Sequence, residues 1–332
     1  MSGYGVGDDM VAKLRKGYLG SSSSTAAEPY VDDDGSSRSV PAAPSTAERA
    51  ARMHSFGPQR RPNGKVYQPR AVAREFEDIA LLRDARKYRE HVLFSGPPGT
   101  GKTALCEAAF AQDATAKHEG MESIVGTADT TEADFVGTFV QDSRTDAWTW
   151  RPGPLHRSVL FDVPLLVDEI ALIDPRVLSV LYPLMDGRNV LRIPMNPDLE
   201  PLPVGKGWFV MAAYNPDVPG ARMSEALRDR FEHHIEVVTD WELCTELGVS
   251  REIVEVAKHL DMKRRAGELT WSPQMRTLLS YARTERRRGQ EYALGNLVAK
   301  APHDDRDEIR GALTKKFGSR VRDLRLGRRF AA

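Results

Sequence analysis

The chain has 332 residues but only two cysteines, no net charge and no long apolar run. Cys106 and Cys244 lie far apart and outside any CxxC or histidine-rich context, so we expect neither a disulfide framework nor a zinc site. Lysine plus arginine and aspartate plus glutamate both number 47, so overall charge argues neither for nor against a nucleic-acid partner. No apolar run approaches the ~20 residues that a membrane-spanning helix needs. These absences favour a globular protein of a reducing compartment.

The first residues also lack the features of a secretory signal peptide. The apolar triplet Met10-Val11-Ala12 is broken at once by Lys13, so no hydrophobic region of the required length forms. Together with the expected reduced state of the cysteines, this predicts a cytoplasmic location.

Composition divides the chain into four parts. The N-terminal part contains a serine run at 21–24, three consecutive aspartates at 32–34 and scattered prolines. Such a segment cannot bury enough apolar surface to offset its ordering entropy, so we expect it to be disordered. The predicted parts are an N-terminal tail (1–65), an α/β domain (66–238), a small helical domain (239–310) and a basic C-terminal tail (311–332).

Short apolar runs alternate with helical patterns in the α/β part. Thr131 and the pair Asp174-Pro175 are typical helix starts, and Gly187 is a typical helix stop. After residue 239 the strands stop, and Ser250 and Ser272-Pro273 are expected to begin helices. Strands that alternate with helices predict a parallel sheet covered on both faces, a three-layer α/β/α fold. The expected strands are 91–94, 123–125, 164–167, 208–213 and 234–238.

The most specific motif is a phosphate loop of the pattern G-x-x-x-x-G-K-[ST]. It follows an apolar run and precedes a helix-like stretch, which is the context that the motif needs. Its glycines let backbone N–H groups turn toward a phosphate, and the helix directs its positive end to the same point. Its lysine is placed to reach the outer phosphates and its threonine to bind magnesium, so ATP and Mg²⁺ are the expected cofactors. The loop consists of Gly96, Pro97, Pro98, Gly99, Thr100, Gly101, Lys102 and Thr103.

Two acidic residues end a later apolar strand. Asp168 and Glu169 follow the run 164–167 in the order that a phosphate-loop protein requires. A carboxylate at such a strand end can hold magnesium through its water shell, and the next one can orient and deprotonate an attacking water. We assign the metal to Asp168 and the water to Glu169.

Polar residues further along supply the remaining candidates. The strand 208–213 leads to Asn215, which is placed to bond the water or the outer phosphate. A short capped helix then carries Arg228 and Arg230, and an arginine there suits a phosphate bound to a neighbouring subunit. Arg228 and Arg230 are both candidates for this contact. Arg276 lies in the first turns of a helix in the second domain.

This ordered set resembles the AAA+ ATPases over about residues 66–302. GTPases and transporter ATPases are disfavoured because the chain shows neither an Asn-Lys-x-Asp motif nor a Leu-Ser-Gly-Gly-Gln signature. The resemblance implies an α/β phosphate-loop domain with a helical lid and the hydrolysis of ATP to ADP and phosphate. It implies that Lys102 and Thr103 match Walker A, Asp168 and Glu169 match Walker B, Asn215 matches sensor 1, Arg230 matches the arginine finger and Arg276 matches sensor 2.

Two insertions narrow the resemblance to the MoxR group. A hairpin-like stretch spans 138–150, and a second insertion spans 189–207 before the Asn215 strand. Motifs such as Asp-Thr-Thr-x-x-Asp-Phe-x-Gly at 129–137 look most like the CbbQ/NorQ and gas-vesicle GvpN relatives. The resemblance implies a homo-hexameric ring that remodels an as yet unidentified protein client, with a von Willebrand A-type partner acting in trans. Pore contact is one interpretation of Phe135, Trp148 and Trp150, and packing within the hairpin is the other.

Three functions follow from these observations. The favoured one is a chaperone-like ring ATPase that remodels or activates a protein complex. The alternative is a nucleic-acid-stimulated motor or restriction-type NTPase, which the basic tail allows, although the chain has no recognisable DNA-binding module and zero net charge. A nucleotide-gated scaffold that barely turns over is the third, and the intact Asp168-Glu169 pair argues against it.

Overall fold

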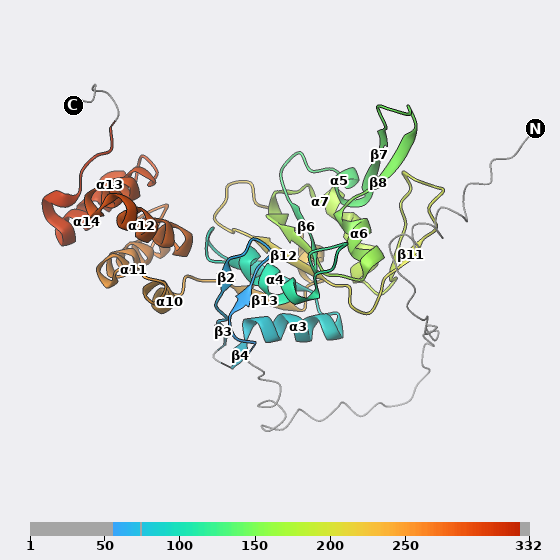
Figure 1. The fold of residues 1–332 in the computed structure, drawn as a ribbon, viewed down its shortest axis with the longest axis horizontal. Coiled ribbons are helices and arrows are strands. Elements are labelled where there is room, and N and C mark those ends of the chain that lie inside the picture. The colour runs from blue at the N-terminus through green and yellow to red at the C-terminus, as the bar shows by residue number, and fades with distance from the viewer. Residues whose placement is uncertain (1–55, 74, 326–332) are drawn as a thin grey trace, which may run out of the picture. The chain divides into compact units, whose positions relative to one another are not determined.

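The structure is a computed structural model that describes residues 56–73 and 75–325. Its centre is a five-stranded sheet in the order β13-β5-β12-β9-β6 (Figure 1). The pairs β6–β9 and β9–β12 are parallel. All five expected strands belong to this sheet, which confirms the α/β fold. Their bounds are β5 (Val92–Ser95), β6 (Glu122–Val125), β9 (Leu165–Asp168), β12 (Val210–Tyr214) and β13 (His233–Glu236).

The burial of the strands follows their place in the sheet. The central strands β5, β9 and β12 are buried along almost their whole length, as expected of continuous apolar runs that are covered on both faces. The edge strands β6 and β13 alternate between half-buried and exposed residues. The hydrophobicity of each run therefore indicates whether the strand lies at the centre or at the edge.

Helices follow most strands of the sheet, and their start signals are those expected. Thr131 and Asp134 form a reciprocal capping box at the start of α5, and the Asp174 carboxylate accepts a hydrogen bond from the backbone N–H of Arg176 at the start of α7. The helices are α3 (Asp78–Tyr88), α4 (Lys102–Phe110), α5 (Glu132–Val136), α6 (Pro154–Phe161), α7 (Pro175–Leu178), α8 (Tyr182–Met185) and α9 (Glu225–Arg228), with 3₁₀ turns at Ala111–Asp113, Ile170–Leu172 and Ser179–Leu181.

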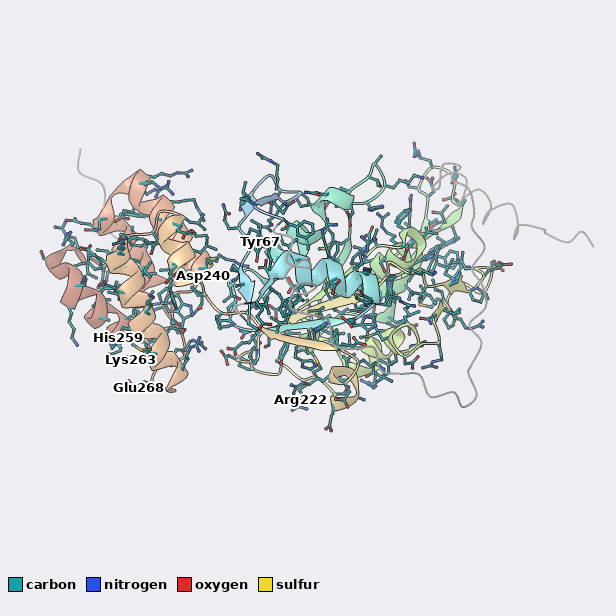
Figure 2. The ribbon with its side chains drawn as sticks, turned by 90° about the horizontal axis from the view of Figure 1, so that it is seen from below. Tyr67, Arg222, Asp240, His259, Lys263 and Glu268 are labelled. Atoms are coloured by element: carbon teal, nitrogen blue, oxygen red, sulfur yellow. The ribbon has the colours of Figure 1, made fainter. Side chains whose placement is uncertain are left out.

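Regular structure begins before residue 66, where the expected tail was to end. Tyr67, labelled in Figure 2, is buried. Its hydroxyl donates a 2.5 Å hydrogen bond to Asp78 at the start of α3. Gln59 and Arg60 pair with the strand that contains Tyr67, so the fold includes part of the expected tail, and residues 1–55 of that tail lie outside the described residues. The small hairpins here are β1 (Gln59–Arg60) with β2 (Val66–Tyr67) and β3 (Ala71–Val72) with β4 (Phe76–Glu77).

The chain after residue 239 is helical, as expected, and has its own hydrophobic core. The last helix extends past residue 310 because Leu313 and Phe317 are buried in that core, so part of the predicted basic tail is folded. The helix expected to begin at Ser272 begins instead at Met275, with Gln274 as its N-cap residue. The helices are α10 (Trp241–Glu246), α11 (Arg251–Arg265), α12 (Met275–Arg288), α13 (Gln290–Ala299) and α14 (Arg306–Phe317), followed by a 3₁₀ turn at Gly318–Arg320.

The described chain divides into two compact units that differ from the expected domains. One unit contains residues 94–103, 214–221 and the chain from 234 onward, and the other contains the remaining residues. The phosphate loop and the turn after β12 thus belong to the same unit as the helices α10 to α14. Within residues 56–73 and 75–325, no helix has the length and hydrophobicity to cross a membrane.

Two buried histidines connect folding to pH. His91 is 3% exposed and accepts a hydrogen bond from the Val210 N–H at Nδ1, and His156 is 4% exposed and accepts one from the Trp150 indole. Burial lowers the pKa of both histidines to about 4, and nearby Arg89 adds to the effect at His91. Both imidazoles are therefore neutral in the folded protein at neutral pH.

We expect the free energy of unfolding to decrease as the pH falls from 7 to 5. The unfolded chain binds protons at these histidines near pH 6.5, whereas the folded chain does so only near pH 4. The contribution of the two histidines to the free energy of unfolding is complete above pH 6.5 and is lost as the pH falls from 6.5 to 4. At pH 5 the loss is about 2 kcal/mol per histidine. Urea unfolding at the two pH values measures the change, and His91→Asn should reduce it by about half. An unfolding free energy that is the same at pH 7 and pH 5 would contradict this prediction.

Candidate functional site

The phosphate loop connects β5 to α4, and its glycines adopt conformations that other residues rarely reach. The φ angles of Gly96, Gly99 and Gly101 are 141°, 85° and 100°. A Cβ atom on Gly96 would lie 2.3 Å from the Val237 carbonyl oxygen, and one on Gly99 would lie 2.7 Å from the Arg276 Cβ. Glycine is therefore required at both positions, because the backbone has a positive φ angle and because neighbouring atoms leave no room for a Cβ atom.

Lys102 is the first residue of α4 and is only 6% exposed. Its ammonium group donates to the carbonyl oxygens of Gly96 at 2.7 Å and Pro97 at 3.0 Å. The charged group is thus held against the backbone of the loop, and a phosphate oxygen that binds there could accept a hydrogen bond from it. With the positive end of a nine-residue helix behind it, this donor set fits a polyphosphate.

The acidic pair lies at the end of β9 in a strained turn. Asp168 is the last residue of the strand, and Glu169 adopts a left-handed conformation with φ 53° and ψ 39°. A non-glycine residue held in this region stores strain of the kind often found at functional sites. Gly126 packs against the same turn, because its N–H donates to the Asp168 carbonyl at 2.7 Å and a Cβ there would lie 2.7 Å from the Glu169 carbonyl oxygen. Gly126 was not predicted from the sequence as a residue of the site.

Asn215 follows β12, which pairs in parallel with β9. Ala212 lies opposite Val167 in this pairing, so the carboxyl ends of both strands meet at one edge of the sheet, where ligands of α/β proteins bind. Asn215 is buried, and its Oδ1 accepts a hydrogen bond from the Asp217 N–H at 3.2 Å. This contact leaves the amide nitrogen of Asn215 as the donor for a ligand.

The two finger candidates differ in how firmly they are held. Arg228 ends α9 and is exposed. Arg230 is half-buried, with its guanidinium 4.3 Å from the centre of the Tyr182 ring and 3.9 Å from the Asp186 carboxylate, and it donates to the Ala226 carbonyl at 2.5 Å. Tyr182 and Asp186 were not identified from the sequence, because nothing local relates them to an arginine more than 40 positions away.

Arg276 is the second residue of α12, and its backbone contacts the phosphate loop. Its N–H donates to the Gly99 carbonyl at 3.0 Å, and the side chain is exposed. The structure thus brings together the predicted sensor 2 arginine and the predicted phosphate loop, which are 177 positions apart if counted from Gly99.

The hairpin that the sequence predicts is present as β7 (Gly137–Gln141) and β8 (Trp148–Pro152), and the second insertion contains β10 (Val190–Leu191) paired with β11 (Leu202–Pro203). Phe135 and Trp150 are buried, and the Trp150 indole donates to His156. Trp148 is 65% exposed. Of the three aromatic residues considered for pore contact, only Trp148 is therefore exposed in this chain.

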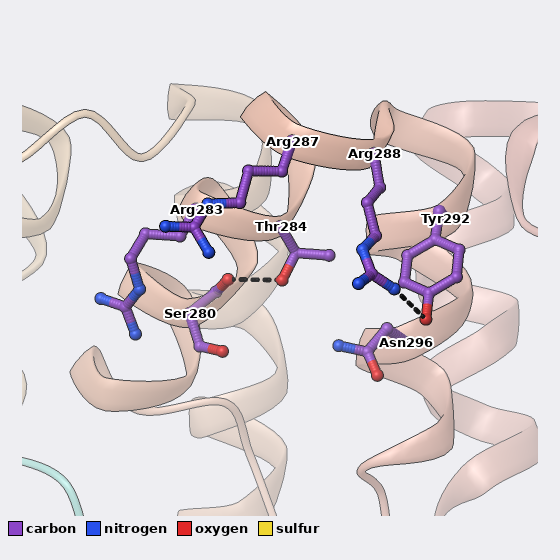
Figure 3. Close-up of a pocket in the computed structure, with 7 residues that line it drawn as sticks. All are labelled: Ser280, Arg283, Thr284, Arg287, Arg288, Tyr292 and Asn296. Carbon is purple, nitrogen blue, oxygen red and sulfur yellow. Dashed lines mark hydrogen bonds between the residues drawn. The ribbon is translucent and has the colours of Figure 1, made fainter.

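A basic pocket of about 300 Å³ lies between α12 and α13 (Figure 3). Arg283, Arg287 and Arg288 line it, and Arg288 donates to the Tyr292 hydroxyl at 3.2 Å. Arg287 and Arg288 occupy the last turn of α12, where the partial negative charge of a helix end favours cations. None of the predicted site residues lines this pocket.

Comparison with known proteins finds similarity to a domain family, a relative and a solved structure. Residues 91–231 match the AAA domain of the dynein-related subfamily. Protein NorQ of Paracoccus denitrificans (strain Pd 1222) is 29% identical over 154 residues, which cover 46% of this chain and 54% of NorQ, so the match spans about half the length of that relative. The crystal structure of a proposed ATPase from Cytophaga hutchinsonii ATCC 33406 matches with a TM-score of 0.38 and 17% identity, over 69% of this chain and 78% of that one.

The matched domain contains most of the site described above. It begins one residue before β5, includes the phosphate loop, Asp168, Glu169 and Asn215, and ends directly after Arg230. Arg276 lies beyond it, in the helical part of the chain. The chain is thus similar, over residues 91–231, to an AAA domain of the dynein-related subfamily, and part of it is similar to NorQ.

Proposed function

We propose that the chain binds ATP with Mg²⁺, hydrolyses it, and uses the energy to remodel a protein partner. The observation that carries the proposal is the phosphate loop, which has three glycines with positive φ and binds the ammonium of the buried Lys102 through the Gly96 and Pro97 carbonyl oxygens. The similarity of residues 91–231 to an AAA domain supports nucleotide binding. The acidic pair at the end of β9 supports hydrolysis, because a loop that only binds nucleotide has no need of it.

Each residue has a separate role in this proposal. Lys102 and the loop N–H groups hold the phosphates, and Thr103 and Asp168 are the residues that would hold Mg²⁺. When bound, Mg²⁺ neutralises the charge that develops on the transferred phosphoryl group. Glu169 orients the attacking water and accepts its proton, and Asn215 donates its amide N–H to the water or the outer phosphate.

A second subunit completes the proposed site. An arginine from the neighbouring chain, Arg230 or Arg228, would stabilise the negative charge on the phosphate. Arg276, which lies in the helical part of the chain, would respond to the bound phosphate. A shared site of this kind requires an oligomer with head-to-tail interfaces, for which a homo-hexameric ring is the arrangement we propose. We further propose that this ring is cytoplasmic and works with a separate partner, a von Willebrand A-type protein, as the resemblance to the CbbQ/NorQ relatives implies.

Replacing Lys102 tests nucleotide binding. We expect Lys102→Ala to weaken ATP binding by about 10- to 100-fold, because it removes a charge-assisted donor worth about 1.5–3 kcal/mol. Titration with a fluorescent ATP analogue in the presence of Mg²⁺ measures the change. Lys87→Ala, which removes an exposed lysine from α3, is the matched control and should bind as the wild type does. Equal affinities of the two variants would refute the phosphate-loop assignment.

The partner class is tested separately from nucleotide binding. A candidate von Willebrand A-type protein should co-purify with the chain in ATP, dissociate in ADP, and raise the rate of phosphate release. DNA is the alternative to the protein partner as an activator of ATP hydrolysis. Stimulation by DNA that falls steeply with salt, without any response to the protein partner, would replace the remodelling proposal by a nucleic-acid motor.

A further inference from the structure

A buried polar network joins α11 to the start of α12. Its centre is Asp261, which is 5% exposed and accepts hydrogen bonds from the Ser272 hydroxyl at 2.8 Å and the Gln274 amide at 2.9 Å. Arg264 and Arg265 donate to the same carboxylate at 3.1 Å and 2.9 Å. Burial alone raises the pKa of Asp261, but these four hydrogen bonds outweigh it and lower the pKa, so the carboxylate stays charged.

The same network fixes the first turn of α12. Gln274 is the N-cap residue of this helix, and its amide oxygen accepts from the Thr239 hydroxyl at 2.6 Å. That hydroxyl in turn accepts from the Met275 N–H at 3.3 Å. The next residue is Arg276, whose N–H donates to the Gly99 carbonyl of the phosphate loop. The position of Arg276 therefore depends on the groups that hold Gln274.

Arg264 connects this network to the turn after β12. Its Nη1 lies 2.8 Å from the Asp217 carboxylate, while its Nε donates to Asp261. Asp217 holds Asn215 through the hydrogen bond from its own N–H. One planar guanidinium thus bridges two carboxylates, of which one belongs to the Asn215 turn and the other to the start of α12.

We propose that Arg264 is a positioning residue that makes Asn215 and Arg276 respond together to the bound nucleotide. This inference rests on the proposed function, in which both residues act on the outer phosphate. A shift of Asn215 displaces Asp217, and the ion pair transmits the displacement through Arg264 and Asp261 to Gln274. Loss of Arg264 leaves Asp261 with Ser272, Gln274 and Arg265, so the start of α12 keeps its fold and only the link to Asp217 is removed.

A double-mutant cycle tests the link, because non-additivity is the direct measure of coupling between two residues. The cycle compares the wild type, Asp217→Asn, Arg264→Gln and the double variant. The first readout is the change in amide hydrogen exchange of residues 272–279 when Mg²⁺ and a non-hydrolysable ATP analogue bind. The second is ATP turnover, separated into kcat and KM.

We expect both single variants to lose most of the nucleotide-dependent protection of 272–279. Each should lower kcat by about 3- to 30-fold with little change in KM, and the double variant should be no worse than either single one. Lys263→Gln is the matched control, because Lys263 lies one position away on α11, where Figure 2 labels it near Glu268. Its ion pairs are with Glu268 and Glu308 and not with Asp217. Asp217→Glu keeps the carboxylate and should remain close to the wild type.

Two outcomes would overturn the inference. One is that Arg264→Gln keeps the full nucleotide-dependent protection, as Lys263→Gln does. The other is that the losses of the two single variants add up in the double variant. If the wild type itself neither binds nor hydrolyses ATP, the proposed function fails, whereas a normal wild type with an unaffected Arg264→Gln refutes only the role of Arg264.

Discussion

Replacing Glu169 by glutamine should lower ATP turnover by about 100- to 10,000-fold and leave ATP binding nearly unchanged, because the amide cannot accept the proton of the attacking water. The side chains have the same shape, and the left-handed backbone at Glu169 is kept by its surroundings. Steady-state phosphate release measures turnover, and titration with a fluorescent ATP analogue measures binding.

The control for this experiment is Glu132→Gln, which removes an exposed carboxylate from the first turn of α5. It should hydrolyse ATP at the wild-type rate. Asp168→Asn should behave differently from Glu169→Gln, because we assign Asp168 to the metal. This variant should need a higher Mg²⁺ concentration for half-maximal turnover. Unchanged turnover in Glu169→Gln would remove Glu169 from the role of base.

The features that the sequence predicts well are those that depend on neighbouring residues. The five strands of the sheet appear as apolar runs, and the caps at Thr131 and Asp174 are read from side chains within three positions of the helix start. Ser272 shows the limit of this reasoning. It has the side chain of a good N-cap, but its hydroxyl bonds Asp261, 11 positions away, and the helix starts at Met275.

Features that depend on distant pairing were not predicted. The contacts of Arg230 with Tyr182 and of Arg264 with Asp217 join residues 47 or 48 positions apart, and no local pattern indicates them. The left-handed backbone of Glu169 is likewise fixed by its surroundings, which include Gly126. Side chains alternate between the two faces of a strand, so Trp148 and Trp150 lie on the same face of β8. The alternation therefore cannot indicate which of the two is buried. Trp150 is buried because it lies nearer the base, where it reaches His156.

Arg230→Ala should reduce turnover by about 1,000-fold or more while single chains bind ATP as before, since an arginine finger acts on the phosphate charge of the transition state. Arg228→Ala is the comparison that assigns the finger. If Arg228→Ala is the inactive variant and Arg230→Ala is active, the finger is the exposed arginine. In that case the contacts of Arg230 with Tyr182 and Asp186 are structural.

Mixing two inactive variants decides whether the finger acts between subunits. Chains with Glu169→Gln keep the arginine, and chains with Arg230→Ala keep the base. In a ring with head-to-tail interfaces, a random mixture restores about a quarter of the sites, because an intact base then meets an intact finger from the next chain. If both residues serve a site within one chain, every site carries a defect and the mixture stays inactive. Recovery of turnover on mixing would therefore establish a shared site, and no recovery under conditions where the variants assemble together would refute it.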